Sequence, residues 1–203
     1  MYKVYFDDRF ITLSREPDRL QKYGLFHKFT NTVEFYNLIS DFQTNTALKN
    51  INIYCEDIKY LWQIFCIYFN EEQAAGGLVR HKSGRYLFIE KRGRLDLPKG
   101  HIDLDENVEN CALREVGEEC GLSGHYIIKP LAPSYHVYSL ESILYLKKTN
   151  WFLMGYNGEM IMQPQAEEGI SGVKWLLPEE FSALKSLTWL SLMDMLNLVV
   201  LKE

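Results

Sequence analysis

Hydrophobic residues in the first 72 positions follow two periods, one typical of strands and one typical of helices. Alternating or short apolar runs indicate strands, and apolar side chains three or four positions apart indicate helices. The segments are two strands at residues 3–6 and 9–14 around an Asp7-Asp8 turn, a helix at 31–43, a strand at 51–54 and a helix at 57–69. This order, ββαβα, predicts a small α/β unit in residues 1–72.

The rest of the chain, residues 74–203, predicts a second α/β domain. Its hydrophobic pattern gives strands at 77–80, 85–91, 125–129, 135–138, 143–146, 151–155 and 173–176. A helix is expected between Asn107, a typical N-cap, and Gly121, which suits the left-handed C′ position. Pro178 is expected to open another helix, and residues 187–201 a last apolar helix. No long Gly, Pro or Ser linker separates the two parts, so we expect them to pack directly together.

Composition limits the classes of protein to consider. With 203 residues, of which 47% are hydrophobic, the chain suits one large or two small domains with a real core. A net charge of −5 argues against sequence-independent nucleic-acid binding. The longest apolar run, residues 60–69, is too short to span a bilayer, and residues 1–10 lack the apolar stretch of a signal peptide.

The cysteines bear on the compartment. Cys55, Cys66, Cys111 and Cys120 form no CxxC pair, so we expect free thiols in a reducing environment. A cytoplasmic protein is therefore expected, with neither nucleic acid nor a membrane as its partner. The sequence leaves open whether it is a monomer or a homodimer.

Charge is unevenly distributed along the second domain. Residues 80–99 contain seven basic residues against two acids, and residues 103–119 contain seven acids against Arg114 alone. A basic segment beside an acidic one suits a polyphosphate that is held between cations. We therefore expect a small-molecule polyphosphate as the ligand.

The most informative segment is a motif at residues 100–122, GHIDLDENVENCALREVGEECGL. It fills every fixed position of the pattern G-x5-E-x7-R-E-U-x-E-E-x-G-U, in which U is aliphatic. Glu115, Glu118 and Glu119 are spaced i, i+3 and i+4 on the expected helix, so their Cβ atoms lie about 5–6 Å apart on one face. Three carboxylates that close repel one another, but a divalent cation bound between them makes the electrostatic energy of the cluster favourable. Carboxylate oxygens are hard ligands, which suit Mg²⁺.

This pattern is the Nudix box, and on its residues the chain resembles the Nudix family of diphosphate hydrolases. The resemblance implies an α/β fold, a Nudix α/β/α sandwich, for residues 74–203. Residues 1–72 then form a small N-terminal ββαβα extension domain. The LPKGH sequence at residues 97–101, which leads into the box, is similar to the version found in dinucleoside polyphosphate and diphosphoinositol polyphosphate hydrolases.

The resemblance also implies a set of metal ligands. In this reading Glu115, Glu118 and Glu119, together with Gly100, hold Mg²⁺, for which Mn²⁺ can substitute. Arg114 is implied to orient a glutamate with its rigid donor fork.

Residues near the box are candidates for binding phosphate. Lys99 can supply a point charge, and Arg92 and Arg94 can each bind a phosphate with two parallel hydrogen bonds. The alternative for each of them is an ordinary loop position. Glu106 is implied to be a structural or outer metal position, and its alternative is a simple partner of the helix dipole.

Further candidates follow the box. In diadenosine tetraphosphate hydrolases, a glutamate in the loop region corresponding to residues 164–170 approaches the metal cluster or acts as the base. Glu167 and Glu168 both match it, and the sequence does not choose between them. Tyr138 and Trp151 are candidates for stacking a nucleobase, with plain packing of alternating strand residues as the alternative.

The resemblance favours a Mg²⁺-dependent hydrolase of a nucleoside diphosphate linked to another moiety X. The catalytic residues are then Arg114, Glu115 and Glu118 of the box and Glu168 of the later loop. The base that takes a proton from the attacking water is a glutamate of the box or of the 167–168 loop. Dinucleoside polyphosphates are the nearest substrates by resemblance. The alternative function is a non-catalytic nucleotide-sensing Nudix module, but such modules typically carry a degraded box. An isoprenoid diphosphate isomerase is a more distant alternative, because its box departs from the hydrolase pattern.

Overall fold

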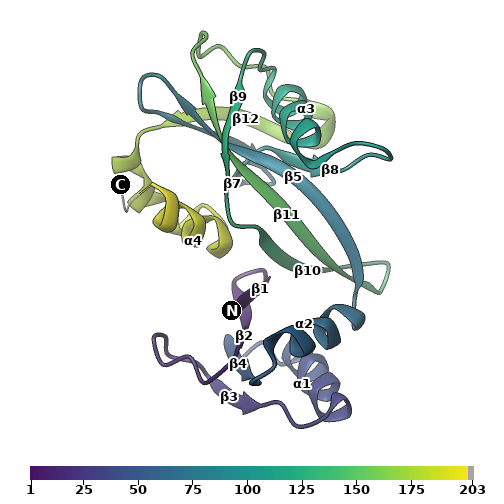
Figure 1. Cartoon of the computed structure of the whole chain (residues 1–203). Helices are drawn as coiled ribbons and strands as arrows, with labels where there is room; N and C mark the ends of the chain where they lie inside the picture. Colours follow the sequence, from purple (N-terminus) through teal and green to yellow (C-terminus); the bar gives the residue numbers. More distant parts are fainter. Residues whose placement is uncertain (201–203) are drawn as a thin grey trace. The chain divides into compact units, whose positions relative to one another are not determined.

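The computed structural model describes residues 1–200 and divides the chain into two compact units (Figure 1). The first unit contains Met1–Glu72 and Tyr135–Lys147, and the second contains Gln73–Ser134 and the chain from Lys148 onward. Tyr135–Lys147 therefore groups with the N-terminal part, whereas its place in the sequence predicts the second domain.

The first unit is a mixed sheet packed against helices. Its elements are β1 (Tyr2–Phe6), β2 (Arg9–Ser14), β3 (Leu25–Lys28), α1 (Thr32–Thr44), β4 (Asn50–Tyr54), α2 (Ile58–Ile67) and β10 (Ser134–Leu140). The strand order is β10-β1-β2-β4-β3. The strands β1 and β2 form an antiparallel hairpin, whereas β4 runs parallel to β2 and β3, and β10 runs parallel to β1.

Most of this unit follows from local sequence signals. The hairpin, both helices and β4 confirm the predicted elements. Asn31 caps α1, because its side chain accepts a hydrogen bond from the Glu34 N–H at 2.9 Å. The strand β3 was not predicted, since its four residues are mostly exposed and show no alternation of buried and exposed positions. The observed order of elements in residues 1–72 is therefore βββαβα.

The second unit contains the remaining elements. They are β5 (Asn70–His81), β6 (Tyr86–Lys91), β7 (Arg94–Asp96), β8 (Lys99–His101), α3 (Val108–Cys120), β9 (Tyr126–Pro130), β11 (Ile143–Tyr156), the 3₁₀ helix η1 (Ala166–Glu168), β12 (Ile170–Leu176), the 3₁₀ helix η2 (Pro178–Ser186) and α4 (Leu190–Val199). The first residues of β5 and of β11 belong to the first unit. The order β12-β6-β5-β11 forms the main sheet, with β7 on β6, β8 on β5 and β9 on β11.

Both faces of this sheet are covered. On β6, Leu87 and Ile89 belong to the apolar cluster that contains the buried side of α3. Tyr86 and Phe88, which point the other way, belong to the cluster that contains α4 and η2. Figure 1 shows α3 and α4 on opposite sides of the sheet. The predicted α/β/α sandwich is confirmed.

Several boundaries differ from those the sequence predicts. Residues 143–146 and 151–155 belong to one strand, β11, because the polar residues between them stay in the ladder and Thr149 is buried. Pro178 opens a 3₁₀ helix rather than an α-helix. The last helix begins at Leu190, and its predicted end at Leu201 lies outside the described residues.

Two global expectations concern membranes and disulfides. None of the helices within residues 1–200 has the length and apolar character that crossing a bilayer requires. All four cysteines carry free thiols.

Candidate active site

The motif helix, α3, begins and ends at the residues that its sequence predicts. Asn107 caps it by accepting from the Asn110 N–H at 2.8 Å. Gly121 ends it with a φ of 65°, a left-handed conformation that glycine adopts without a Cβ clash. The apolar side of α3, with Ala112 and Val116, is buried against the sheet. Glu119 lies on this buried side, whereas Glu115 and Glu118 lie at its edge and are progressively more exposed.

Gly100 on β8 lies directly beneath a box glutamate. A Cβ atom at this position would lie 2.1 Å from the carboxyl carbon of Glu115, far inside any allowed contact. The absence of a side chain therefore creates the space that the Glu115 carboxylate fills. Glycine at this position is what allows the Glu115 carboxylate to lie this close to β8.

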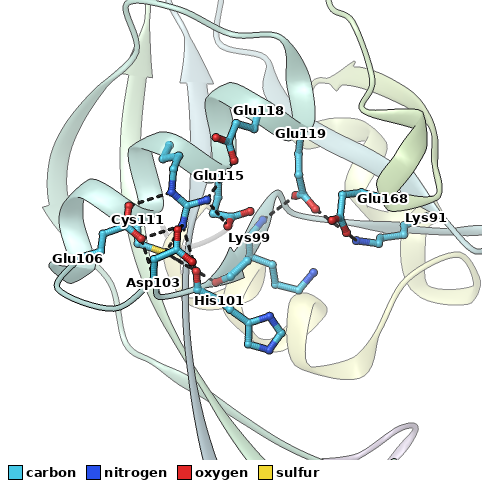
Figure 2. A network of polar contacts seen from close by, with 12 residues as sticks. Lys91, Lys99, His101, Asp103, Glu106, Cys111, Glu115, Glu118, Glu119 and Glu168 are labelled. Atoms are coloured by element: carbon cyan, nitrogen blue, oxygen red, sulfur yellow. Dashed lines mark hydrogen bonds and ion pairs between the residues drawn. The ribbon is translucent and has the colours of Figure 1, made fainter.

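Arg114 binds the carboxylates of Glu106, Glu115 and Glu118, which are labelled in Figure 2. Its Nε and Nη2 donate to the two Glu106 carboxylate oxygens at 2.9 and 2.7 Å, which is a bidentate pair. Its Nη1 donates to Glu115 at 2.7 Å and to Glu118 at 3.0 Å. Its Nη2 also donates to the His101 carbonyl at 3.1 Å. One guanidinium thus fixes two box glutamates and ties the loop before α3 to the helix.

The electrostatics around Arg114 reflect this set of contacts. Hydrogen bonds from Arg114 lower the pKa of Glu106 to about 2, although burial opposes the shift. The carboxylates of Glu106, Glu115 and Glu118 in turn raise the pKa of Arg114. Burial raises the pKa of the Cys111 thiol to about 12. The Arg114–Glu106 pair is therefore a permanent ion pair at neutral pH, and Cys111 remains a neutral thiol.

Of the three motif glutamates Glu115, Glu118 and Glu119, the last is the most deeply buried. Its side chain is 2% exposed, and burial raises its pKa against the opposing influence of Lys99 and Lys91. The Lys99 backbone N–H donates to its Oε2 at 2.8 Å. The Lys91 ammonium lies 3.3 Å from its Oε1. These two donors compensate a carboxylate that would otherwise be costly to bury.

Lys91 also reaches the loop after β11. Its Nζ lies 3.4 Å from Glu168 Oε2, and Glu168 is 56% exposed at the end of η1 (Figure 2). Of the two glutamates that the sequence leaves open, Glu168 is the one joined through Lys91 to Glu119. The structure thus brings a solvent-accessible carboxylate next to the buried end of the motif.

Comparison with known proteins identifies the family of this chain. The family model of the NUDIX domain matches residues 70–193, which is more than half of the chain. The chain belongs to the Nudix family. The predicted family and fold are confirmed.

Individual relatives are more distant. The chain is 32% identical over 90 residues to the putative mutator protein MutT4 of Mycobacterium tuberculosis (strain CDC 1551 / Oshkosh), a match that spans 43% of this chain and only 35% of that protein. The Ap4A hydrolase of C. elegans in a binary complex covers 62% of this chain and 93% of its own, with 20% identity and a TM-score of 0.49. The MutT protein of Methanosarcina mazei Go1 covers 63% and 91%, with 17% identity and a TM-score of 0.47.

The Nudix helix offers the chemistry that a hard dication requires. Three carboxylates lie on one face of α3, and the Gly100 cradle holds Glu115 against β8. As they stand, no three His, Cys, Asp or Glu side chains in the described residues 1–200 converge closely enough to form a metal cluster. The reason is that Arg114 holds Glu115 and Glu118, while Lys91 and the Lys99 amide hold Glu119. Carboxylate oxygens are the type of ligand that a hard dication binds, and here they accept from Arg114, Lys91 and the Lys99 backbone N–H.

Lys99 does not present a free ammonium group. Its Nζ donates to Asp96 Oδ2 at 2.7 Å, and its contribution to the Nudix glutamates comes from its backbone N–H. Burial lowers the pKa of Lys99, but Asp96, Glu119 and Glu115 outweigh it and the pKa is raised. Lys99 therefore acts at Glu119 through the main chain.

The two arginines differ in their surroundings. Arg92 and Gly93, with φ values of 54° and 73°, form a two-residue turn between β6 and β7, and Arg92 is exposed there. The Arg94 guanidinium instead lies 4.2 Å from the ring centre of Trp189, in a cation–π contact. Of the two, Arg92 is the more accessible to a ligand.

The contacts of the two aromatic candidates are with residues other than the Nudix glutamates. Trp151 is 6% exposed in the core beside α4, and its indole N–H donates to Ser134 at 2.9 Å. A ring this buried offers no face to a base, so the expected stacking role of Trp151 is not supported. Tyr138 belongs to the first unit, where it stacks on Tyr145 and donates to Glu72.

Lys91 is the site residue that sequence reasoning missed. The alternation of side chains between the two faces of β6 indicates which way Lys91 points. Leu87 and Ile89 face α3, so Lys91, the next residue of the same parity, has to face the same side. The sequence motif alone does not extend to this strand.

Proposed function

We propose that this protein is a Mg²⁺-dependent Nudix pyrophosphohydrolase that cleaves a diphosphate linkage in a nucleoside diphosphate joined to another moiety, with dinucleoside polyphosphates as its substrates. The proposal rests chiefly on one observation. The Glu115 carboxylate is seated over Gly100 while Arg114 fixes both Glu115 and Glu118. The intact ligand set is prepared on a rigid helix rather than on a loop.

The residues that would hold the cation are Glu115, Glu118 and Glu119, with the Gly100 carbonyl beside them. When bound, the cation supplies charge neutralisation at the phosphates and makes water a better nucleophile at neutral pH. Mn²⁺ offers the same preference for oxygen ligands. The part of Arg114 is to keep Glu115 and Glu118 oriented, because its planar fork fixes both carboxylates at once.

Glu168 is the proposed general base. It is the half-exposed carboxylate at the edge of the site, and its contact with Lys91 places it near Glu119. A carboxylate in that position can take a proton from the attacking water and release it to solvent. Glu167 lies on the same 3₁₀ turn. The contact with Lys91 is the reason for proposing Glu168 rather than Glu167 as the base.

The basic segment before the box supports a polyphosphate substrate. Arg92 is exposed on the β6–β7 turn, and the following strand leads to Lys99 and Gly100. A chain of four or more phosphates has more charge to present to such a segment than a diphosphate has, and its binding should weaken as salt rises. The free thiols support a cytoplasmic location.

A substrate screen tests the proposal. The protein with Mg²⁺ would be incubated with diadenosine tetraphosphate, nucleotide sugars and coenzyme diphosphates in ¹⁸O-labelled water, and the product masses read. We expect diadenosine tetraphosphate to give a nucleoside triphosphate and a monophosphate, with ¹⁸O in one of them. Turnover of a nucleotide sugar alone would refute the substrate class. Binding of nucleotides without turnover of any would refute the hydrolase and favour the nucleotide-sensing alternative.

A further inference from the structure

The Lys91 ammonium joins two acidic residues that come from different parts of the second unit. Its Nζ lies 3.3 Å from Oε1 of the buried Glu119 and 3.4 Å from Oε2 of the exposed Glu168 (Figure 2). The Lys91 side chain itself is 24% exposed, so solvent reaches it. It is a cation placed between two carboxylates, one of which, Glu119, is a proposed cation ligand.

The sheet fixes this position. Lys91 pairs with Ile170 in the antiparallel ladder between β6 and β12, and Glu168 lies two residues before Ile170. Lys91 is also the last residue of β6 before the tight turn at Arg92. The register of the ladder therefore brings Glu168 to Lys91, and the strand parity points Lys91 at α3.

A cation bound by Glu119 has to compete with this lysine. The ammonium group and a divalent cation carry charges of the same sign and share the Glu119 carboxylate, so each weakens the binding of the other. Lys99 is in a different situation, because its Nζ is held at 2.7 Å by Asp96, which is not a box residue. A cation held by Glu119 would therefore compete with the Lys91 ammonium and not with the Lys99 ammonium.

We propose that Lys91 is held by Glu119 and Glu168 while no cation is present and is released to bind the polyphosphate of the substrate when a cation takes the carboxylates. This inference rests on the proposed function. A released ammonium on a flexible stem is a strong point charge for a phosphate group. Lys91 thereby links the loading of the cation to the binding of substrate, and Glu168 loses its ion-pair partner at the same time.

The first test measures binding of the metal alone. Mn²⁺ is titrated by calorimetry into the wild-type protein, the Lys91→Met variant and the Lys174→Met control, in which the removed charge pairs with Glu90 instead. We expect Lys91→Met to bind Mn²⁺ about tenfold more tightly, as the loss of a like charge within a few ångströms implies. Lys174→Met should match the wild type. Equal or weaker Mn²⁺ binding by Lys91→Met would overturn the proposal.

The second test measures binding of the polyphosphate. A methylene analogue of diadenosine tetraphosphate, which is not hydrolysed, is titrated at saturating Mn²⁺. We expect Lys91→Met to bind it about tenfold more weakly, with binding restored in Lys91→Arg, because one charge-assisted phosphate contact is lost and regained. Unchanged affinity in Lys91→Met would show that the lysine only braces Glu119 and would overturn the proposal.

These results separate the inference from the proposed function. If the wild type hydrolyses its substrate but Lys91→Met shows wild-type affinities, the inference fails and the function stands. If the wild type binds no Mn²⁺ at all, the proposed function fails together with it.

Discussion

Replacing Gly100 with alanine perturbs the site at a single carboxylate. The added methyl group would lie 2.1 Å from the Glu115 carboxyl carbon, whereas ordinary contact begins at 3.4 Å, so the carboxylate has to retreat by about 1.3 Å. The Glu115–Arg114 hydrogen bond of 2.7 Å cannot survive that displacement unchanged. Because the clash is with the end of a side chain rather than with backbone, the fold should adapt at modest cost.

The expected effects of Gly100→Ala differ in size for stability and for activity. Weakening one charged hydrogen bond costs about 1–2 kcal/mol, which lowers the melting temperature of a protein of this length by roughly 2–8 °C. Displacing a catalytic group by about 1 Å can reduce turnover by about 10²-fold. We therefore expect a folded protein with about 1% of wild-type turnover and weakened Mn²⁺ binding.

The assay compares Gly100→Ala with a matched glycine variant. Gly172→Ala is the control, because a Cβ there meets Glu90 only at ordinary contact distance, 3.4 Å or more, in the same unit. Circular dichroism checks the fold, calorimetry measures Mn²⁺ affinity, and turnover is measured on the substrate identified by the screen. Wild-type turnover and metal affinity in Gly100→Ala would refute the assignment of Gly100 as the cradle of Glu115.

The other predictions concern pH, metal and the proposed base. The pKa of Glu106 is lowered to about 2 by Arg114. The stabilisation that this ion pair gives the folded protein is therefore complete above about pH 4.5 and is lost as the pH falls toward 2. The melting-temperature gap between wild type and Glu106→Gln should therefore shrink as pH falls from 4.5 toward 2, and a constant gap would contradict the ion pair. Millimolar Mg²⁺ or Mn²⁺ should raise the melting temperature and EDTA should reverse the rise; no shift would count against a working metal site. Glu168→Gln should lower kcat by about 10²-fold, while the exposed Glu159→Gln stays at the wild-type rate.

Features encoded in a short stretch of sequence were predictable. Asn107 and Gly121 end the Nudix helix because capping depends on groups within a few residues. The common face of Glu115, Glu118 and Glu119 follows from helical spacing alone. The sandwich of the second domain follows from the family that these residues indicate.

Features that depend on distant partners were not predictable. The short strands β7 and β8 are stabilised by β6 and β5, not by their own three residues each. The contact between Lys91 and Glu168 joins positions 77 apart and requires the register of β6 against β12. The burial of Trp151 depends on which face of β11 meets α4, a choice that a polar segment just before it obscures.

The most direct test of the proposed mechanism compares turnover by charge-neutral variants on α3. Glu118→Gln and Glu119→Gln remove one proposed cation ligand each, and Glu109→Gln removes an equal charge from an exposed position in the first turn of the same helix. The proposed mechanism predicts that both ligand variants lose at least about 10²-fold in turnover while remaining folded, and that Glu109→Gln retains the wild-type rate. Near-wild-type turnover in both Glu118→Gln and Glu119→Gln would contradict the claim that the Nudix glutamates carry the reaction.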